Sequence, residues 1–229
     1  MLLALPQLLS GEKVSEVRHL IDGGRWEDGR GTAGRQSALA KNNRQLAADC
    51  ERGEKARQII LEALEKDGLF MSAALPRAIF PPLFNRYDAA AGHAFGNHVD
   101  NAIRFLPGGA GAIRTDLSAT LFLSEPTDYD GGELVIEDSY GAHEVKLAAG
   151  DMVLYPSTSL HRVEPVTRGS RMASFFWIES RIRDDAQRTI LLDMDAAIRS
   201  LAASLGDARE EVVTLTGCYH NLLRQWATG

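Results

Sequence analysis

The strongest constraint on the fold is the hydrophobic pattern of residues 77–180, where short apolar or alternating runs are separated by turn residues. Runs of this length, repeated about every 8–12 residues, are typical of an antiparallel β-sandwich or a barrel such as a jelly roll. The runs are Ala119–Leu123, Leu134–Glu137, Glu144–Leu147, Met152–Tyr155, Arg162–Val166 and Met172–Ile178. We therefore expect a β-rich core in the middle of the chain.

The regions on either side of this core have helical periodicity. Val14, Val17 and Ile21 predict a helix that begins after Ser10 as N-cap. Residues 44–66 are expected to be helical with an interruption at Gly53, and the apolar segment 1–10 is expected to be a first strand. Residues 182–226 predict two helices separated by Gly206, which form a helical hairpin. The expected divisions are 1–76, 77–180 and 181–229.

Residues 23–36 form a segment rich in glycine and arginine, with arginines at positions 25, 30 and 35. The glycine density marks a loop. The loop is either solvated or a flexible flap beside a binding cleft, and its arginines could attract an anionic substrate.

Composition excludes several classes of protein. With 45% hydrophobic residues the chain can form a core, and no segment has the roughly 20 apolar residues of a membrane span. A net charge of −6 argues against wrapping nucleic acid. Cys50 and Cys218 alone cannot build a disulfide framework or a cysteine zinc site. The N-terminus lacks the features of a signal peptide, so we expect a cytoplasmic protein.

Three residues have the types and spacing of a metal site. His98 and Asp100 form a His-x-Asp pair, and in an extended chain both side chains point to the same side. His161 begins the strand after a polar loop, where it could complete the site, although a histidine there could also simply bond a backbone carbonyl. Two histidines and one carboxylate, with other positions open, make the facial triad of non-haem Fe(II) oxygenases.

Arg171 follows His161 by ten residues and heads an apolar strand. By strand alternation it shares a face with Ala173, Phe175 and Trp177. It either faces solvent or points inward, and in the second case it needs an anionic partner such as a carboxylate.

The order His-x-Asp, then a histidine, then an arginine on a β-rich frame resembles the Fe(II)/2-oxoglutarate-dependent dioxygenase superfamily. Other motifs make the core similar to that of prolyl 4-hydroxylases, and the similarity is closer still to bacterial PKHD-type hydroxylases, a group linked to iron-uptake loci. The motifs are Phe84-Asn85-Arg86-Tyr87, Gly131-Gly132-Glu133-Leu134, Gly150-Asp151 and the segment from Arg114 to Leu123. The resemblance covers nearly the whole chain.

This resemblance implies an α+β fold: a double-stranded β-helix (jelly-roll) core with N-terminal helices and a C-terminal helical hairpin. It implies that His98, Asp100 and His161 bind Fe(II), and that Arg171 holds the distal carboxylate of 2-oxoglutarate with Tyr87 close by. O2 is the other cosubstrate, and ascorbate (vitamin C) is expected as an accessory cofactor.

The resemblance also leaves several residues open. Some relatives have a tyrosine that bonds the same carboxylate where this chain has Phe122, so Ser118 or Thr120 could substitute. His93 could line the mouth of the site.

The implied function is a hydroxylase that couples decarboxylation of 2-oxoglutarate, to succinate and CO2, with hydroxylation of a small-molecule or peptidyl substrate. An iron-chelating small molecule is one candidate for that substrate, because of the link to iron loci. The alternatives are a non-enzymatic jelly-roll module that binds or senses iron or a 2-oxo acid, and a cupin-like metalloenzyme without 2-oxoglutarate. We expect no nucleic-acid or membrane partner, while the C-terminal helices could support a homo-oligomer.

Overall fold

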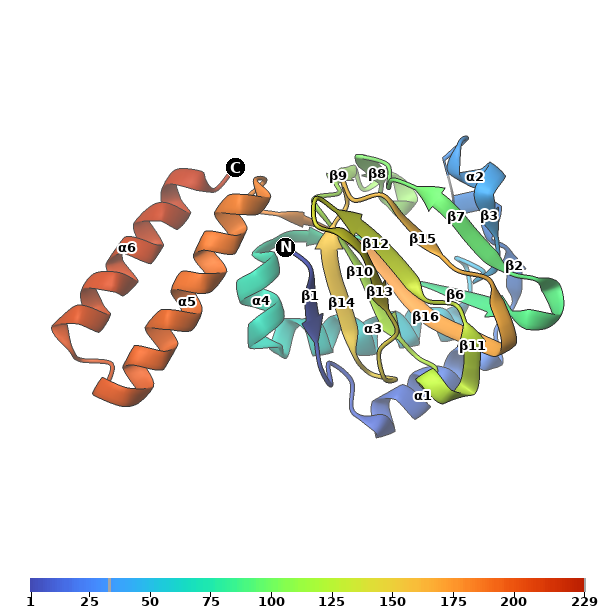
Figure 1. The fold of residues 1–229 in the computed structure, drawn as a ribbon, viewed down its shortest axis with the longest axis horizontal. Helices are drawn as coiled ribbons and strands as arrows, with labels where there is room; N and C mark the ends of the chain where they lie inside the picture. Colours follow the sequence, from blue (N-terminus) through green and yellow to red (C-terminus); the bar gives the residue numbers. More distant parts are fainter. Residues whose placement is uncertain (33, 229) are drawn as a thin grey trace.

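Two antiparallel β-sheets face each other and form the jelly-roll core of the computed structural model (Figure 1), which describes residues 1–32 and 34–228. Residue 33 of the glycine- and arginine-rich loop and residue 229 of the C-terminal segment lie outside the described residues. The main path of the larger sheet is β1 (Leu3–Leu5), β14 (Met152–Pro156), β10 (Leu117–Phe122), β16 (Val166–Ser180), β6 (Leu83–Asp88), β4 (Arg44–Leu46) and β2 (Trp26–Asp28), with β5 (Pro76–Ile79) and β11 (Tyr129–Gly131) also paired to β16.

The smaller sheet lies over the larger one and carries the rim of the pocket described below. Its order is β13 (Gly141–Val145), β12 (Leu134–Asp138), β15 (His161–Val163), β7 (Ala94–His98) and β3 (Lys41–Asn42). A separate hairpin consists of β8 (Ile103–Phe105) and β9 (Ala112–Arg114).

Alternation along β16 divides the interior into two parts. Met172, Phe176 and Ile178 point to the helical side of the larger sheet and join the core beneath the helices. Arg171 and Trp177 point to the other side, where they line the pocket between the sheets. A single long strand therefore connects the apolar core that stabilises the fold with the polar site.

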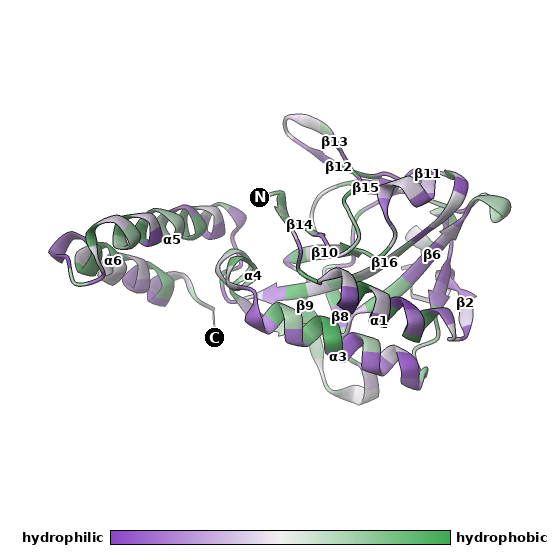
Figure 2. Cartoon of the chain, turned by 90° about the horizontal axis from the view of Figure 1, so that it is seen from below, coloured by the Kyte–Doolittle hydropathy of each residue, from purple (hydrophilic) through white to green (hydrophobic). Residues whose placement is uncertain are grey.

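The outer face of the larger sheet is covered by α1 (Gly11–Asp22) and α3 (Glu51–Lys66), followed by the short α4 (Gly68–Ala74). Figure 2 shows that α1 and α3 run along this face and carry both hydrophobic and hydrophilic residues, as helices with one buried side do. Ser10 caps α1 by accepting a hydrogen bond from the Lys13 N–H, as expected from the sequence. Another short helix, α2 (Ser37–Ala40), lies beside β7.

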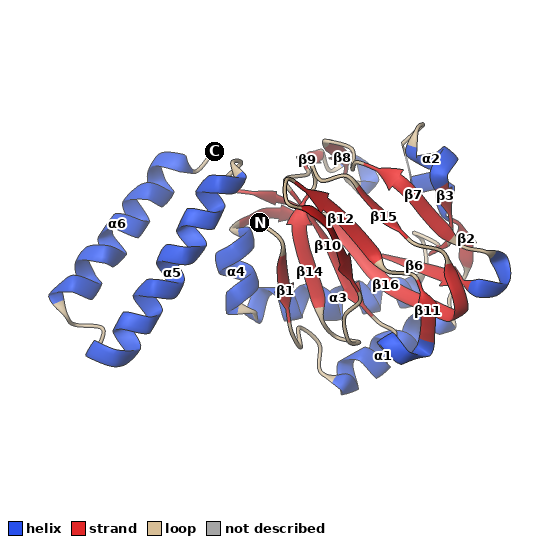
Figure 3. Cartoon of the chain, viewed as in Figure 1, coloured by secondary structure: helices blue, strands red, loops and turns tan. Residues whose placement is uncertain are grey.

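The C-terminal helices α5 (Asp185–Leu205) and α6 (Glu210–Trp226) form the expected hairpin, which projects to one side of the sheets (Figure 3). Polar contacts and the packing of Leu192 on the core attach α5 to the rest of the fold. The buried Arg188 donates to the carbonyls of Ile182 and Arg183, and Asp195 accepts from the hydroxyl of Ser72 in α4 at 2.7 Å. Among the described residues, no helix is long and apolar enough to cross a membrane.

The mixed helix and sheet class is confirmed, and each of the six strand-like runs overlaps a strand, although residues 146–147 and 164–165 lie outside the strands. Three expectations for the N-terminal third were wrong. Trp26–Asp28, within the expected loop 23–36, forms β2 because it pairs with β4. Residues 44–46 form strand β4 instead of the start of a helix, because the edge of the larger sheet offers them β6 as a partner. Gly53 does not interrupt a helix but lies inside α3, where the Leu46 side chain packs too closely for a larger residue.

Phe176→Ala tests whether the helical side of β16 contributes to the stability of the fold. Phe176 is fully buried beneath the helices, so the substitution should lower the free energy of unfolding by about 3–5 kcal/mol, the usual cost of removing a buried aromatic ring. The measurement is urea denaturation of the metal-free protein. Tyr140→Ala, at an exposed hairpin tip, is the control and should change the midpoint little. Equal midpoints for both variants would contradict this description of the core.

Candidate metal centre

His98, Asp100 and His161 converge at the rim between the two sheets. His98 ends β7 and His161 begins β15, and the two residues lie directly opposite each other in the antiparallel pair. Asp100 follows two residues after His98. One potential ligand atom from each side chain lies within 4.8 Å of the others, and the nearest His161 Nε2–Asp100 oxygen distance is 3.7 Å. Two imidazoles and one carboxylate on one side of an ion are the donor set of a facial triad.

Both histidine rings are oriented through their Nδ1 atoms. His98 Nδ1 lies 2.9 Å from the Gly96 carbonyl and His161 Nδ1 lies 3.0 Å from the Ser159 carbonyl. Since a carbonyl only accepts, each Nδ1 carries the proton and each Nε2 lone pair is free to bind a metal. Burial, followed by the nearby His161, lowers the pKa of His98 to about 4, so its ring is neutral at pH 7.

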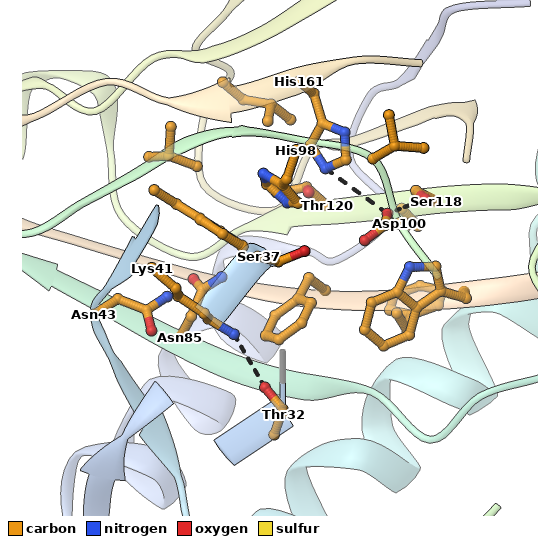
Figure 4. Close-up of a pocket in the computed structure, with 18 of the residues that line it drawn as sticks. Thr32, Ser37, Lys41, Asn43, Asn85, His98, Asp100, Ser118, Thr120 and His161 are labelled. Carbon is orange, nitrogen blue, oxygen red and sulfur yellow. Dashed lines mark hydrogen bonds and ion pairs between the residues drawn. The ribbon is translucent and has the colours of Figure 1, made fainter. Parts of the chain in front are cut away.

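A pair of serines holds Asp100 in place. Ser118 Oγ donates to Asp100 Oδ2 at 2.7 Å (Figure 4). The same oxygen lies 2.7 Å from Ser157 Oγ. The structure therefore does not support Ser118 as the residue that replaces the missing tyrosine near 2-oxoglutarate, because its hydroxyl proton is used on Asp100. Thr120 lines the same pocket and contacts the Tyr155 hydroxyl instead.

Arg171 points inward and is 1% exposed. Its guanidinium packs against the rings of Tyr87 and Phe122, at 5.4 and 5.2 Å from their centroids. Nε and Nη1 have no hydrogen-bond partner among the described residues. A buried guanidinium without a counter-ion is costly, and the two free N–H groups suit a carboxylate oxygen pair.

Three tyrosines surround this guanidinium. Tyr87 is its cross-strand neighbour and Tyr155 lies between it and the metal-site residues in the pocket lining. Burial raises the pKa of Tyr87 to about 12 and that of Tyr155 well above its usual value, so both hydroxyls stay protonated and can donate. The Tyr129 hydroxyl is buried beside Arg171, and burial raises its pKa although the charge and hydrogen bonding of Arg171 oppose this shift.

Gly132 explains why the Gly131-Gly132 motif belongs to this site. It has a φ of 67°, and a Cβ there would lie 3.1 Å from Arg171 Cδ and 2.9 Å from a Val166 methyl carbon. A side chain at this position would therefore collide with the packing around Arg171, and glycine also adopts the left-handed backbone without strain.

These residues fit Fe(II) and 2-oxoglutarate. The three ligand atoms leave one side of an ion open, and the Arg171 guanidinium, with Nε and Nη1 unpaired among the described residues, lies in the same pocket. A diacid bound to the metal at one end would supply the missing carboxylate to Arg171 at the other.

The expectation for His93 was wrong. His93 is buried but does not belong to the described lining of the pocket, and its Nδ1 accepts the backbone N–H of Asp88 at 2.9 Å. This bond closes the turn between β6 and β7, so the role of His93 in this structure is to support the loop that leads to His98.

Sequence reasoning also missed pocket residues. Tyr155 could have been found by alternation from Val153 along β14, since both side chains point between the sheets. Lys41 and Arg104 could not, because they lie on short strands that show no periodicity, and only the tertiary fold brings them to the pocket.

The fold and the site define a 2-oxoglutarate- and Fe(II)-dependent oxygenase. The model of the 2OG-Fe(II) oxygenase superfamily matches residues 82–179, and that of the PKHD-type hydroxylase C-terminal domain matches residues 185–228. PKHD-type hydroxylases of Phenylobacterium zucineum and Variovorax paradoxus are 60% and 56% identical, each over 99% of both chains. The chain belongs to the PKHD-type hydroxylase family.

Solved structures agree on the fold at lower identity. A Pseudomonas putida prolyl 4-hydroxylase has a TM-score of 0.52 at 21% identity, covering 79% of this chain and 92% of that one. A non-haem α-ketoglutarate-dependent carbocyclase from nogalamycin biosynthesis has a TM-score of 0.56 at 15% identity, covering 79% and 80%. The family supports a hydroxylase over the two alternatives, a binding module and a cupin-like enzyme without 2-oxoglutarate.

Ser118→Ala should weaken divalent-metal binding by about 10–100-fold, the usual effect of removing a hydrogen bond to a metal-ligating side chain. The fold should be unaffected, because alanine fills most of the same space. The measurement is calorimetric titration of the metal-free protein with Fe(II) under anaerobic conditions, with the exposed Ser139→Ala as the control. Wild-type affinity in Ser118→Ala would show that the hydroxyl does not position Asp100.

Proposed function

We propose that this protein hydroxylates its substrate with His98, Asp100 and His161 binding Fe(II) and Arg171 binding the distal carboxylate of 2-oxoglutarate. The observation that carries the proposal is the unpaired guanidinium of Arg171, buried in the same pocket as the three converging ligands. Tyr87 lies against this guanidinium and orients it, and the Tyr155 and Tyr129 hydroxyls supply further donors close by.

Bound Fe(II) would supply the oxidative chemistry, in which O2, 2-oxoglutarate and a C–H bond of the substrate give succinate, CO2 and the hydroxylated product, with one oxygen atom of O2 in succinate and the other in the product. The chain's own residues bind and orient. With Fe(II) bound by two neutral imidazoles and the singly charged Asp100, the net charge of the metal site would be positive. This charge would attract the anionic end of the cosubstrate. The rings of Tyr87, Phe122 and Tyr155 exclude water around Arg171, which strengthens its interaction with a carboxylate.

The substrate we propose is an iron-chelating small molecule of the kind handled by iron or siderophore metabolism, with the reaction in the cytoplasm and ascorbate keeping the iron reduced. The association of PKHD-type hydroxylases with iron-uptake loci supports this proposal. A peptidyl substrate is the other candidate.

His161→Ala should abolish iron binding and the conversion of 2-oxoglutarate to succinate, because a ligand on β15 is lost from a three-residue site. Metal content and succinate release are measured on the anaerobically loaded protein after O2 is added. His220→Ala, an exposed histidine on α6, should behave as wild type. Failure of the wild-type protein to bind any divalent metal would overturn the proposed function.

Arg171→Met should raise the KM for 2-oxoglutarate about 10–100-fold, because loss of charge-assisted hydrogen bonds costs about 1.5–3 kcal/mol. The same substitution should leave the ligand-free protein as stable as wild type, or more stable, because it removes a buried and unpaired charge. Steady-state kinetics and urea denaturation measure the two effects. A large loss of stability with an unchanged KM would identify Arg171 as a structural residue only.

We also propose that the C-terminal hairpin supports a homo-oligomer. Its support is the set of large apolar side chains left exposed on α5 and α6: Ile190, Leu205, Val213 and Leu215. Val213→Glu should then lower the sedimentation coefficient of the native protein to that of a monomer. A wild-type protein that is monomeric at all concentrations would refute the proposal.

A further inference from the structure

Two further cations line the pocket, and neither is needed for Fe(II) or 2-oxoglutarate. Lys41, on β3, and Arg104, on β8, both line it, and Asp100 is the only carboxylate among the described lining residues. Formal charges show the imbalance. Fe(II), Asp100, the 2-oxoglutarate dianion and Arg171 sum to zero, so the positive charges of Lys41 and Arg104 remain unbalanced.

The two cations converge on one residue. Lys41 Nζ donates to Thr32 Oγ1 at 3.0 Å and Arg104 Nη1 donates to the Thr32 carbonyl at 3.0 Å. The Thr32 hydroxyl in turn donates to Gln45, so it is free to accept from Lys41. Thr32 is half-buried at the rim, and in Figure 4 the Lys41–Thr32 pair lies across the pocket from His161.

Each cation packs against an aromatic ring of the pocket that neighbours a residue of the metal site. Lys41 Nζ lies 5.3 Å from the centroid of Phe95, whose ring stacks on His98 at 3.6 Å. Arg104 Cζ lies 3.6 Å from the centroid of Trp177, which pairs across the sheet with Ser118, the residue that holds Asp100. An anionic group at these cations would therefore place the rest of its molecule beside the metal.

Among the described residues, no carboxylate forms an ion pair with either cation, although the charge of Asp100 acts on both. Lys41 is mostly buried, and burial followed by the charge of Arg104 lowers its pKa to about 8 despite opposing effects of Asp100 and the exposed Asp28. Arg104 Nε is buried and has no partner among the described residues. Buried cations without a paired carboxylate favour the binding of an anionic ligand.

Two of the three loop arginines that the sequence singled out for this role, Arg25 and Arg30, are occupied elsewhere. Arg25 pairs with Glu27 and Asp49, and Arg30 lies 3.6 Å from Asp28. Neither residue belongs to the described lining of the pocket, and the loop contributes Thr32 and Gly34 instead. The cations of the pocket thus come from the sheet and the β8–β9 hairpin.

We propose that Lys41 and Arg104, joined through Thr32, form a subsite for an anionic oxygen group, a carboxylate or a phosphate, on the substrate that is hydroxylated. The inference rests on the proposed function, since it assumes that 2-oxoglutarate occupies Arg171 and that the metal lies between the two anion sites. It narrows the substrate to molecules whose anionic group lies a short distance from the oxidised carbon.

The test is calorimetric titration of the anaerobic complex of the full-length protein with Fe(II) and saturating 2-oxoglutarate, so that Arg171 is filled and no turnover occurs. The probes are benzoate, phenyl phosphate and the neutral benzamide. At least one anion should bind and benzamide should not, and the tighter of the two anions identifies the group. Equal binding of benzamide, or no binding of either anion, would overturn the inference.

Lys41→Met and Arg104→Met should each raise the Kd of the tighter anion about tenfold, as expected for loss of one charge-assisted contact, and the double substitution should abolish binding. Lys55→Met, an exposed lysine on α3, is the matched control and should leave the Kd unchanged. Unchanged Kd values in folded Lys41→Met and Arg104→Met proteins would overturn the inference. The wild-type comparison of anions with benzamide does not depend on whether the variants fold.

Failure of the anion subsite can be distinguished from failure of the proposed hydroxylase function. Succinate release by the wild-type protein tests the hydroxylase chemistry without any probe. Succinate release with no preference for anionic probes would refute the subsite alone. Anion binding that depends on Lys41 and Arg104, in a protein that never releases succinate, would support the subsite and refute the proposed function.

Discussion

The antiparallel pairing of β7 with β15 is the constraint on which the site depends. It sets His98 directly opposite His161, and the chain leaving β7 brings Asp100 to the same ion position. A shift of this register by one residue would turn one histidine to the other face of the sheet. The smaller sheet therefore serves as the frame of the metal centre, while the larger sheet supplies Arg171 and most of the apolar packing that holds the frame in place.

Within a single strand, side chains on one face belong to the apolar core that stabilises the fold, and those on the other face belong to the site. On β10, Leu117 and Leu121 pack beneath the helices, whereas Ser118 and Thr120 line the pocket. On β16 the same division separates Met172 and Ile178 from the residues of the site. Because successive side chains point to opposite faces, each strand binds the helical layer with one face and builds the polar pocket with the other.

The sequence predicted those parts of the site that depend on local spacing. The His98-x-Asp100 pair and the alternation that sets Arg171 on one face with Ala173, Phe175 and Trp177 are short-range properties, and the strands of the middle region follow from turn residues. Alternation alone left open whether that face points inward, and only the family resemblance favoured the inward orientation that the structure has. Lys41 and Arg104 could not be predicted in this way, since β3 has two residues and β8 has three. Their placement depends on β3 pairing with β7 and on the ring of Trp177, contacts between segments far apart in the chain.

Three cations, Arg171, Lys41 and Arg104, line the pocket, so 2-oxoglutarate and the substrate must bind different ones. Arg171 is fully buried with two N–H positions unpaired, whereas Lys41 and Arg104 already donate to Thr32 near the rim. A carboxylate therefore gains more by reaching Arg171, where it satisfies groups that nothing else satisfies, than by displacing bonds that Thr32 already makes. The difference in pairing favours 2-oxoglutarate at Arg171 and leaves the proposed anion subsite for the anionic group of the substrate.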